Sequence, residues 1–134
     1  MKKITFYVPE TLSFVKRIVK YLPQATRSRL PAEISIVPVS AKKSAALNRI
    51  YRGKRTPANV LSFLYGKEYG EIIVCPSIIR SEAKKQGHAY EYQLAWMMVH
   101  GMIHLSGLHH EKSAGTAKRV ERLEKRILKE LSGV

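Results

Sequence analysis

The segment from about Tyr90 to Leu105 constrains the fold most, because apolar residues would lie on nearly every side of a helix formed there. A helix without a polar face is buried in the centre of a protein, so we expect the rest of the chain to pack around it. The apolar residues are Leu94, Ala95, Trp96, Met97, Met98, Val99, Met102 and Ile103.

Two histidines interrupt this apolar segment. His100 and His104 are four residues apart, a spacing that places both side chains on one face of a helix. Burying imidazole rings is costly unless their nitrogens are engaged, by a metal or by hydrogen bonds to neighbours. Gly107 follows, where the helix can end in a left-handed conformation, and His110 lies three residues further on the returning chain.

Together the three histidines form a candidate catalytic zinc site. The pattern His-x-x-x-His-x-x-Gly-x-x-His is the ligand skeleton of metzincin peptidases. Three imidazole ligands leave a fourth coordination position open, as in catalytic rather than structural zinc sites. We therefore predict that His100, His104 and His110 hold one Zn²⁺ per chain; three ordinary, hydrogen-bonded histidines are the alternative.

The residue after the first histidine argues against a peptidase. Zinc peptidases carry a glutamate there as general base, whereas this chain has Gly101. Glycine inside a helix costs roughly 1 kcal/mol relative to alanine, so its presence needs a reason. Close packing of the helix is one reason, and space beside the metal for a bulky substrate group is the other.

The charge balance points to a polyanionic partner. The 134 residues include 24 Lys and Arg against 10 Asp and Glu, a formal net charge of +14. An excess of this size, spread along the chain, indicates nucleic acid, although a solvated basic surface is the alternative. The single cysteine, Cys75, allows no internal disulfide, and no apolar run reaches membrane-spanning length. We expect a cytoplasmic monomer that does not bind membranes.

Periodicity predicts a single α+β domain over residues 1–134, with a small mixed sheet packed against helices and the metal motif on the central buried helix. Two strands separated by a short glycine-containing loop predict a hairpin. The expected strands are 2–8, 33–38, 59–64 and 71–75, and the expected helices are 9–22, 41–51, 76–85, 90–105 and 114–131, with a basic connector at 24–31.

Two helices carry more specific expectations. Ser40 and Gly53 are predicted to cap the helix between them. The apolar face of that helix is expected to consist of Ala46, Leu47, Ile50 and Tyr51. The last helix is expected to bury Val120, Leu123, Ile127 and Leu131, with Glu124 on its solvated side.

Three blocks within about residues 47–111 carry a family resemblance. One is the histidine motif, His100-Gly101-Met102-Ile103-His104 through His110. The second runs from Leu47-Asn48 through Tyr51-Arg52-Gly53-Lys54 to Pro57, Asn59 and Val60-Leu61-Ser62-Phe63, and the third is Gly70-Glu71-Ile72 with Glu82-Ala83 and Gln86-Gly87. In this order and spacing they resemble the YbeY-type bacterial endoribonucleases, known as rRNA maturation factors.

The chain departs from the family pattern at four positions. His109 stands where the family usually has Asp, which removes a carboxylate that could orient a ligating histidine. The other departures are Leu108 for Tyr, Glu71 for Asp and Leu64 for Pro.

The resemblance implies a zinc-dependent, single-strand-specific endoribonuclease with a zincin-like site, acting in small-subunit rRNA 3′-end maturation and ribosome quality control. Single-stranded RNA, rRNA and the ribosome or its proteins are the implied partners. Arg52 is implied to reach the cleft and stabilise the phosphate beside the three histidines. Lys54, Arg55 and Ser62 are further expected RNA contacts, and His109, Glu71 and Glu111 are candidate general bases. A non-catalytic, metal-stabilised RNA-binding or ribosome-assembly factor and a metzincin-like metallopeptidase are the alternatives.

Overall fold

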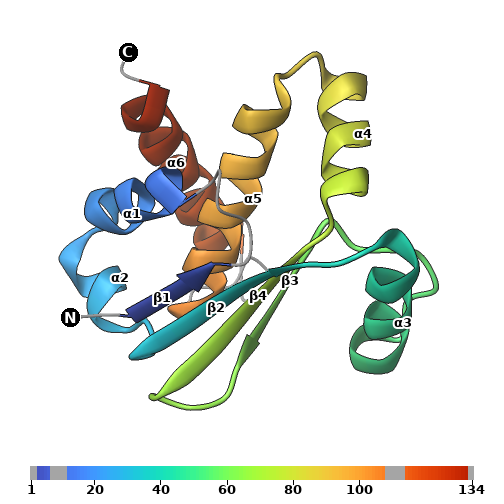
Figure 1. Ribbon diagram of the computed structural model, residues 1–134. Coiled ribbons are helices and arrows are strands. Elements are labelled where there is room, and N and C mark those ends of the chain that lie inside the picture. The colour runs from blue at the N-terminus through green and yellow to red at the C-terminus, as the bar shows by residue number, and fades with distance from the viewer. Residues whose placement is uncertain (1–2, 7–11, 108–113, 133–134) are drawn as a thin grey trace.

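The computed structural model describes residues 3–6, 12–107 and 114–132, which form a sheet and a layer of helices (Figure 1). None of the helices in these ranges has both the length and the apolar character that crossing a bilayer requires. The strands are β1 (Lys3–Phe6), β2 (Glu33–Pro38), β3 (Val60–Leu64) and β4 (Tyr69–Val74), and the helices are α1 (Leu12–Tyr21), α2 (Gln24–Ser28), α3 (Ala41–Arg52), α4 (Pro76–Gln86), α5 (Tyr90–Leu105) and α6 (Ala114–Ser132).

The sheet is mixed, as predicted. Its strand order is β1-β2-β4-β3, with β1 parallel to β2, β2 parallel to β4, and β3 antiparallel to β4. The backbone N–H of Tyr65 donates to the carbonyl of Tyr69 at 2.9 Å and closes the β3–β4 hairpin. The predicted hairpin and the α+β class are therefore confirmed.

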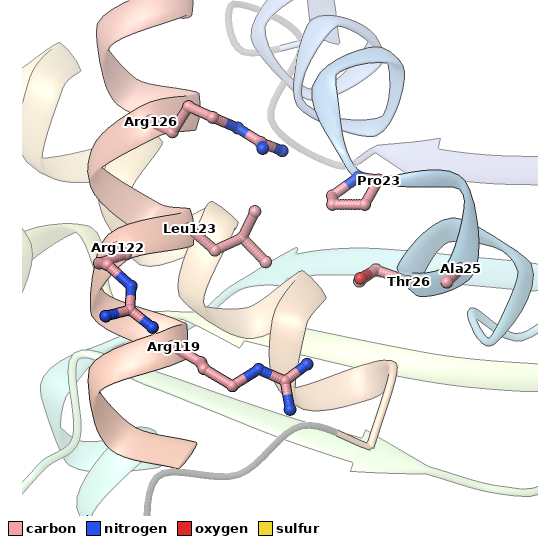
Figure 2. A pocket seen from close by; sticks show the side chains of 7 residues that line it. All are labelled: Pro23, Ala25, Thr26, Arg119, Arg122, Leu123 and Arg126. Atoms are coloured by element: carbon pink, nitrogen blue, oxygen red, sulfur yellow. The ribbon is translucent and has the colours of Figure 1, made fainter. Parts of the chain in front are cut away.

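The basic connector expected at 24–31 contains a short helix that apolar periodicity did not predict. Pro23 is the N-cap of α2, and its fixed φ of −56° leads the chain into the helical turn. Helix α2 lies across a groove from α6 (Figure 2). It buries none of its own five residues, so it has no apolar periodicity by which the sequence could reveal it.

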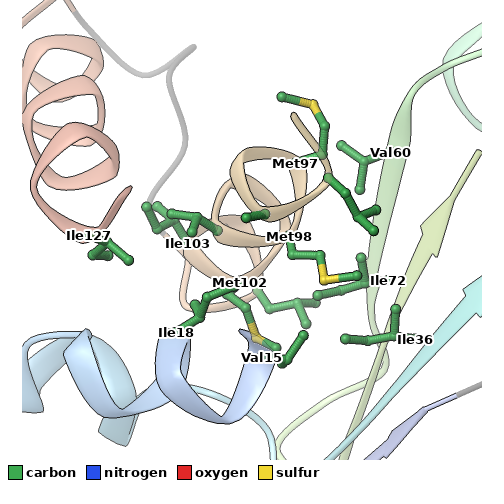
Figure 3. Close-up of a cluster of buried hydrophobic side chains, with 14 of the residues drawn as sticks. Val15, Ile18, Ile36, Val60, Ile72, Met97, Met98, Met102, Ile103 and Ile127 are labelled. Atoms are coloured by element: carbon green, nitrogen blue, oxygen red, sulfur yellow. The ribbon is translucent and has the colours of Figure 1, made fainter. Parts of the chain in front are cut away.

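Helix α5 is the centre of the molecule, as its apolar sequence predicted. It contacts β3 and β4 on one side and α1, α4 and α6 on others. Figure 3 shows Met98 and Met102 of α5 among side chains from the sheet, such as Ile72, and from α1, such as Ile18. Each fully buried side chain of this size contributes about 1.5–3 kcal/mol. Among the described residues, α5 supplies more buried core side chains than any other helix or strand.

The caps of α3 are confirmed. The Ser40 side chain accepts a hydrogen bond from the backbone N–H of Lys43 at 3.1 Å, and Gly53 adopts a left-handed φ of 69° at the other end. Because a side chain at that φ is strained, glycine suits the position.

The predicted apolar face of α3 is wrong. Ile50 and Tyr51 are 67% and 60% exposed, whereas Ser44 and Asn48 are buried. The expected face also included Ala46 and Leu47, which are only half-buried.

The reason is that the buried side of α3 is hydrogen-bonded to the backbone of the loop before β3. The Ser44 hydroxyl donates to the carbonyl of Ala58 at 2.7 Å and accepts from its N–H at 2.9 Å. The Asn48 amide donates to the carbonyl of Thr56 at 2.8 Å. The buried side of α3 therefore supplies hydrogen bonds to the loop before β3.

Candidate metal centre

His100 and His104 lie side by side on α5. Their ring centroids are 4.4 Å apart with an angle of 41° between the rings, which confirms that both occupy one helix face. Both residues are half-buried, and the Nε2 atom of His104 is buried. Gly107 follows with a φ of 90°, the left-handed conformation expected after the helix.

A carboxylate from another helix reaches His100. Oε2 of Glu124, on α6, lies 2.7 Å from His100 Nδ1. The indole N–H of Trp96 donates to the other carboxylate oxygen at 3.4 Å. Glu124 is only 5% exposed, so its two oxygens are engaged inside the interface between α5 and α6.

The expectation that Glu124 is solvated is therefore wrong. Val120 and Ile127, one turn away on either side, are fully buried, and Glu124 shares their face of α6. Leu123, expected on that line, is only partly buried. A pattern of apolar residues at helical spacing does not reveal a buried carboxylate, because positions 123 and 124 fit that spacing equally well.

The contact with Glu124 fits His100 for metal binding. An ionised carboxylate at Nδ1 holds the ring proton on that nitrogen and leaves the lone pair of Nε2 available to a metal. Histidine ligands of zinc commonly have such a carboxylate on their second nitrogen. The donor chemistry of His100 and His104 thus fits Zn²⁺, and a carboxylate orients one of them despite His109.

Gly101 is a packing residue. A Cβ atom there would lie 3.1 Å from Cγ2 of Ile72 and 3.2 Å from Oγ of Ser62. The glycine lets α5 approach the sheet, and the Ser62 hydroxyl donates to its carbonyl at 3.3 Å. Of the two reasons considered, close packing is the correct one, since the position faces the sheet and leaves no room for a substrate group.

Arg52, Lys54 and Arg55 are all exposed around the end of α3. Tyr51, beside Arg52, contacts the Phe63 ring edge-on at a centroid distance of 4.9 Å. Phe63 and Ser62 are consecutive in β3 and face opposite sides of it, so this contact lies across the strand from α5. The expected phosphate contact of Arg52 and the expected RNA contacts of Lys54, Arg55 and Ser62 stay predictions.

The third predicted ligand, His110, lies outside the described residues, as do His109 and Glu111. Within the ranges that are described, no three His, Cys, Asp or Glu side chains form a potential metal site. The structure thus brings together two of the three predicted ligands, and the third remains a prediction.

Glu71 is no longer a good candidate for the general base. It pairs with Phe63 in the hairpin, while its neighbour Ile72 faces Gly101, so Glu71 points to the sheet face away from the histidines. The pKa of the Tyr65 hydroxyl is raised first by burial and then by the charge of Glu71.

The family model and the curated relatives that match this chain carry the same description. The family model described as Endoribonuclease YbeY matches residues 2–132. The chain is 36% identical over 134 residues to "Endoribonuclease YbeY" of Methylococcus capsulatus, covering 95% of this chain and 85% of that protein. The protein of the same name from Azoarcus sp. is 38% identical over 114 residues, 77% of this chain but only 45% of the relative.

A solved structure has the same fold. The solution structure of a Thermotoga maritima protein superimposes with a TM-score of 0.65 at 25% sequence identity. The match covers 99% of this chain and 90% of that one. The arrangement of sheet and helices therefore recurs in a structure determined by experiment.

Proposed function

Since the chain belongs to the YbeY endoribonuclease family, we propose that it is a zinc-dependent endoribonuclease that hydrolyses phosphodiester bonds of single-stranded RNA. The observation that carries the proposal is the His100–Glu124 contact beside His104. A buried carboxylate on one imidazole, with a second imidazole one helical turn away, is the arrangement that a metal-binding pair requires.

His100, His104 and His110 are the proposed ligands. When bound, Zn²⁺ supplies a Lewis acid that polarises a phosphoryl oxygen. Glu124 keeps the proton of His100 on Nδ1, and Trp96 holds the carboxylate by its second oxygen. These two side chains are positioning residues, and they fix the direction of the His100 ring before any substrate arrives.

Arg52 is proposed to stabilise the negative charge that develops on the phosphate. Its exposure at the end of α3 and the resemblance of the surrounding block to the family pattern support this role. Lys54 and Arg55 extend the positive charge along the adjoining loop. Ser62 stays a predicted RNA contact, although its hydroxyl donates to the Gly101 carbonyl in this structure. Such contacts hold an RNA backbone with little dependence on sequence.

The proposed cellular role follows from the family resemblance. It is maturation of the 3′ end of small-subunit rRNA and ribosome quality control, with the ribosome or its proteins as partners. A cytoplasmic location is proposed with it, which agrees with the free, buried Cys75.

A cleavage assay tests the proposal. Labelled single-stranded RNA is incubated with the protein and with the His100→Ala and Arg52→Glu variants. We expect each variant to lose at least about 100-fold in rate, the scale found when one charge-stabilising donor is removed. Circular dichroism checks that both variants are folded. Full cleavage by both would contradict the nuclease assignment and favour a non-catalytic RNA-binding factor.

The structure supplies an argument against the peptidase alternative. Gly101 has no side chain that could act as a base, and a Cβ atom there would lie 3.1 Å from Ile72 and 3.2 Å from Ser62, so the position serves packing. Casein incubated with the zinc-loaded protein is therefore expected to remain intact. Cleavage that a chelator abolishes would overturn this conclusion.

A further inference from the structure

A cationic groove lies between α2 and α6, and the proposed function does not use it. Its volume is about 400 Å³. Figure 2 shows Arg119 and Arg126 of α6 extending toward Pro23 and Thr26, with Leu123 between them; Arg122 also lines the groove. No carboxylate is among the side chains that line it.

Two acidic residues of α6 are engaged elsewhere. Glu121 pairs with Lys125 at 3.0 Å, and Glu124 is directed inward to His100. Within the described ranges, no ion pair joins Arg119, Arg122 or Arg126 to a carboxylate. Among the described residues, Arg119 and Arg126 therefore extend into the groove, and Arg122 lines it, without an ion pair to a carboxylate.

This arrangement opposes the stability of the helix. Arg119 and Arg122 are three residues apart and Arg122 and Arg126 four apart, the spacings at which like charges on a helix repel. An anion in the groove would relieve that repulsion. Guanidinium groups suit phosphate in particular, because their planar forks donate two parallel hydrogen bonds to two oxygens.

The spacing favours an extended polyanion over a single small anion. Arg119 and Arg126 are separated along the helix axis by about 10 Å, at about 1.5 Å per residue. One phosphate cannot bridge that length, whereas consecutive phosphates of a nucleic acid strand can. The apolar side chains of Leu123 and Pro23 offer contacts for the sugars between them.

We propose that the α2–α6 groove binds the phosphate backbone of the single-stranded RNA substrate, at a site separate from the histidines. This inference rests on the proposed function, and it adds a second point at which the strand is held. Helix α6 carries the groove arginines and Glu124, so one rigid element connects the bound backbone with the residue that orients His100.

Binding measurements test the groove without cleavage. Fluorescence anisotropy follows a labelled single-stranded RNA in the presence of a chelator, at several salt concentrations. The test variant combines Arg119→Gln, Arg122→Gln and Arg126→Gln. The control combines Lys42→Gln, Lys84→Gln and Lys85→Gln, which removes the same charge from exposed positions on α3 and α4.

We expect the arginine variant to bind RNA at least about ten-fold more weakly than the control at low salt. The slope of its log affinity against log salt concentration should also be smaller by about 2, because each lost phosphate contact reduces the slope by about 0.7. An arginine variant that binds RNA like the control would overturn the proposal. So would one that keeps RNA binding but loses binding to poly-glutamate, because the groove would then fit an acidic protein. These measurements test whether the groove binds RNA, and their outcome does not depend on whether the wild-type protein cleaves RNA.

Discussion

At the scale of single residues, one buried carboxylate links the core to the proposed chemistry. Glu124 lies in an otherwise apolar stripe of α6 and is satisfied there by Trp96 and His100. A buried ionised group without such partners would be strongly destabilising. The contact therefore stabilises the carboxylate and at the same time fixes which nitrogen of His100 can bind a metal.

Replacing this carboxylate tests its positioning role. In Glu124→Gln the amide has nearly the same shape but no charge, so it holds the Nδ1 proton less firmly. We expect zinc affinity to fall by about 10–100-fold, the usual effect of losing such a partner. Competition with a chromophoric chelator measures the affinity.

Glu121→Gln is the matched control, because Glu121 is on the same helix but exposed. Equal zinc affinity in the two variants would show that Glu124 has no role in orienting the ligand.

At the scale of secondary structure, apolar periodicity predicted α5 and the β3–β4 hairpin well. Both depend on patterns that few other structures share: apolar residues all round a helix, and two β-rich segments around a short loop. The caps of α3 were also predicted, because Ser40 and Gly53 act through local backbone geometry.

The two errors about buried helix faces have a common physical cause. The buried faces of α3 and α6 contain Ser44, Asn48 and Glu124, whose burial depends on hydrogen-bond partners distant in the sequence. A pattern of apolar residues carries no information about such partners. The same limit applies to the site: the histidine spacing predicted the pair on α5, whereas nothing local indicated that α6 would supply a carboxylate.

The buried polar face of α3 leads to a stability prediction. Asn48→Ala removes the buried amide that donates to the carbonyl of Thr56, and a typical hydrogen bond of this kind contributes about 0.5–1.5 kcal/mol. Urea denaturation is expected to show that loss in the free energy of unfolding.

Arg49→Ala, on the exposed side of the same helix, is expected to change stability by less than about 0.5 kcal/mol. If Asn48→Ala were equally mild, the loop before β3 would not depend on α3.

At the scale of the whole molecule, the core and the candidate metal centre share one helix. Helix α5 contacts two strands and three helices, so His100 and His104 project from the most constrained element of the fold. A site on a rigid element keeps its ligands near their working positions. The positive charge of the molecule, +14, acts over a longer range and favours the approach of a polyanion such as RNA.

Metal binding to such a central helix should stabilise the entire fold. At a free zinc concentration 100-fold above the dissociation constant, linkage predicts about 2.7 kcal/mol of added stability. For a domain of this size we expect Tm to rise by roughly 10 °C. Thermal unfolding with zinc and with a chelator measures the shift, and His104→Ala should abolish it. A Tm that is the same in both conditions would contradict the metal assignment.

The contact between α5 and α6 also affects when, during synthesis and folding, His100 becomes oriented. His100 and Glu124 are separated by 24 positions in the chain, so a polypeptide still under synthesis has the imidazoles before it has the carboxylate. His100 gains its fixed orientation only after α6 has formed and docked. Loading of the proposed zinc site should therefore be a late event in maturation, and a chain in which α6 has not yet docked should bind the ion weakly.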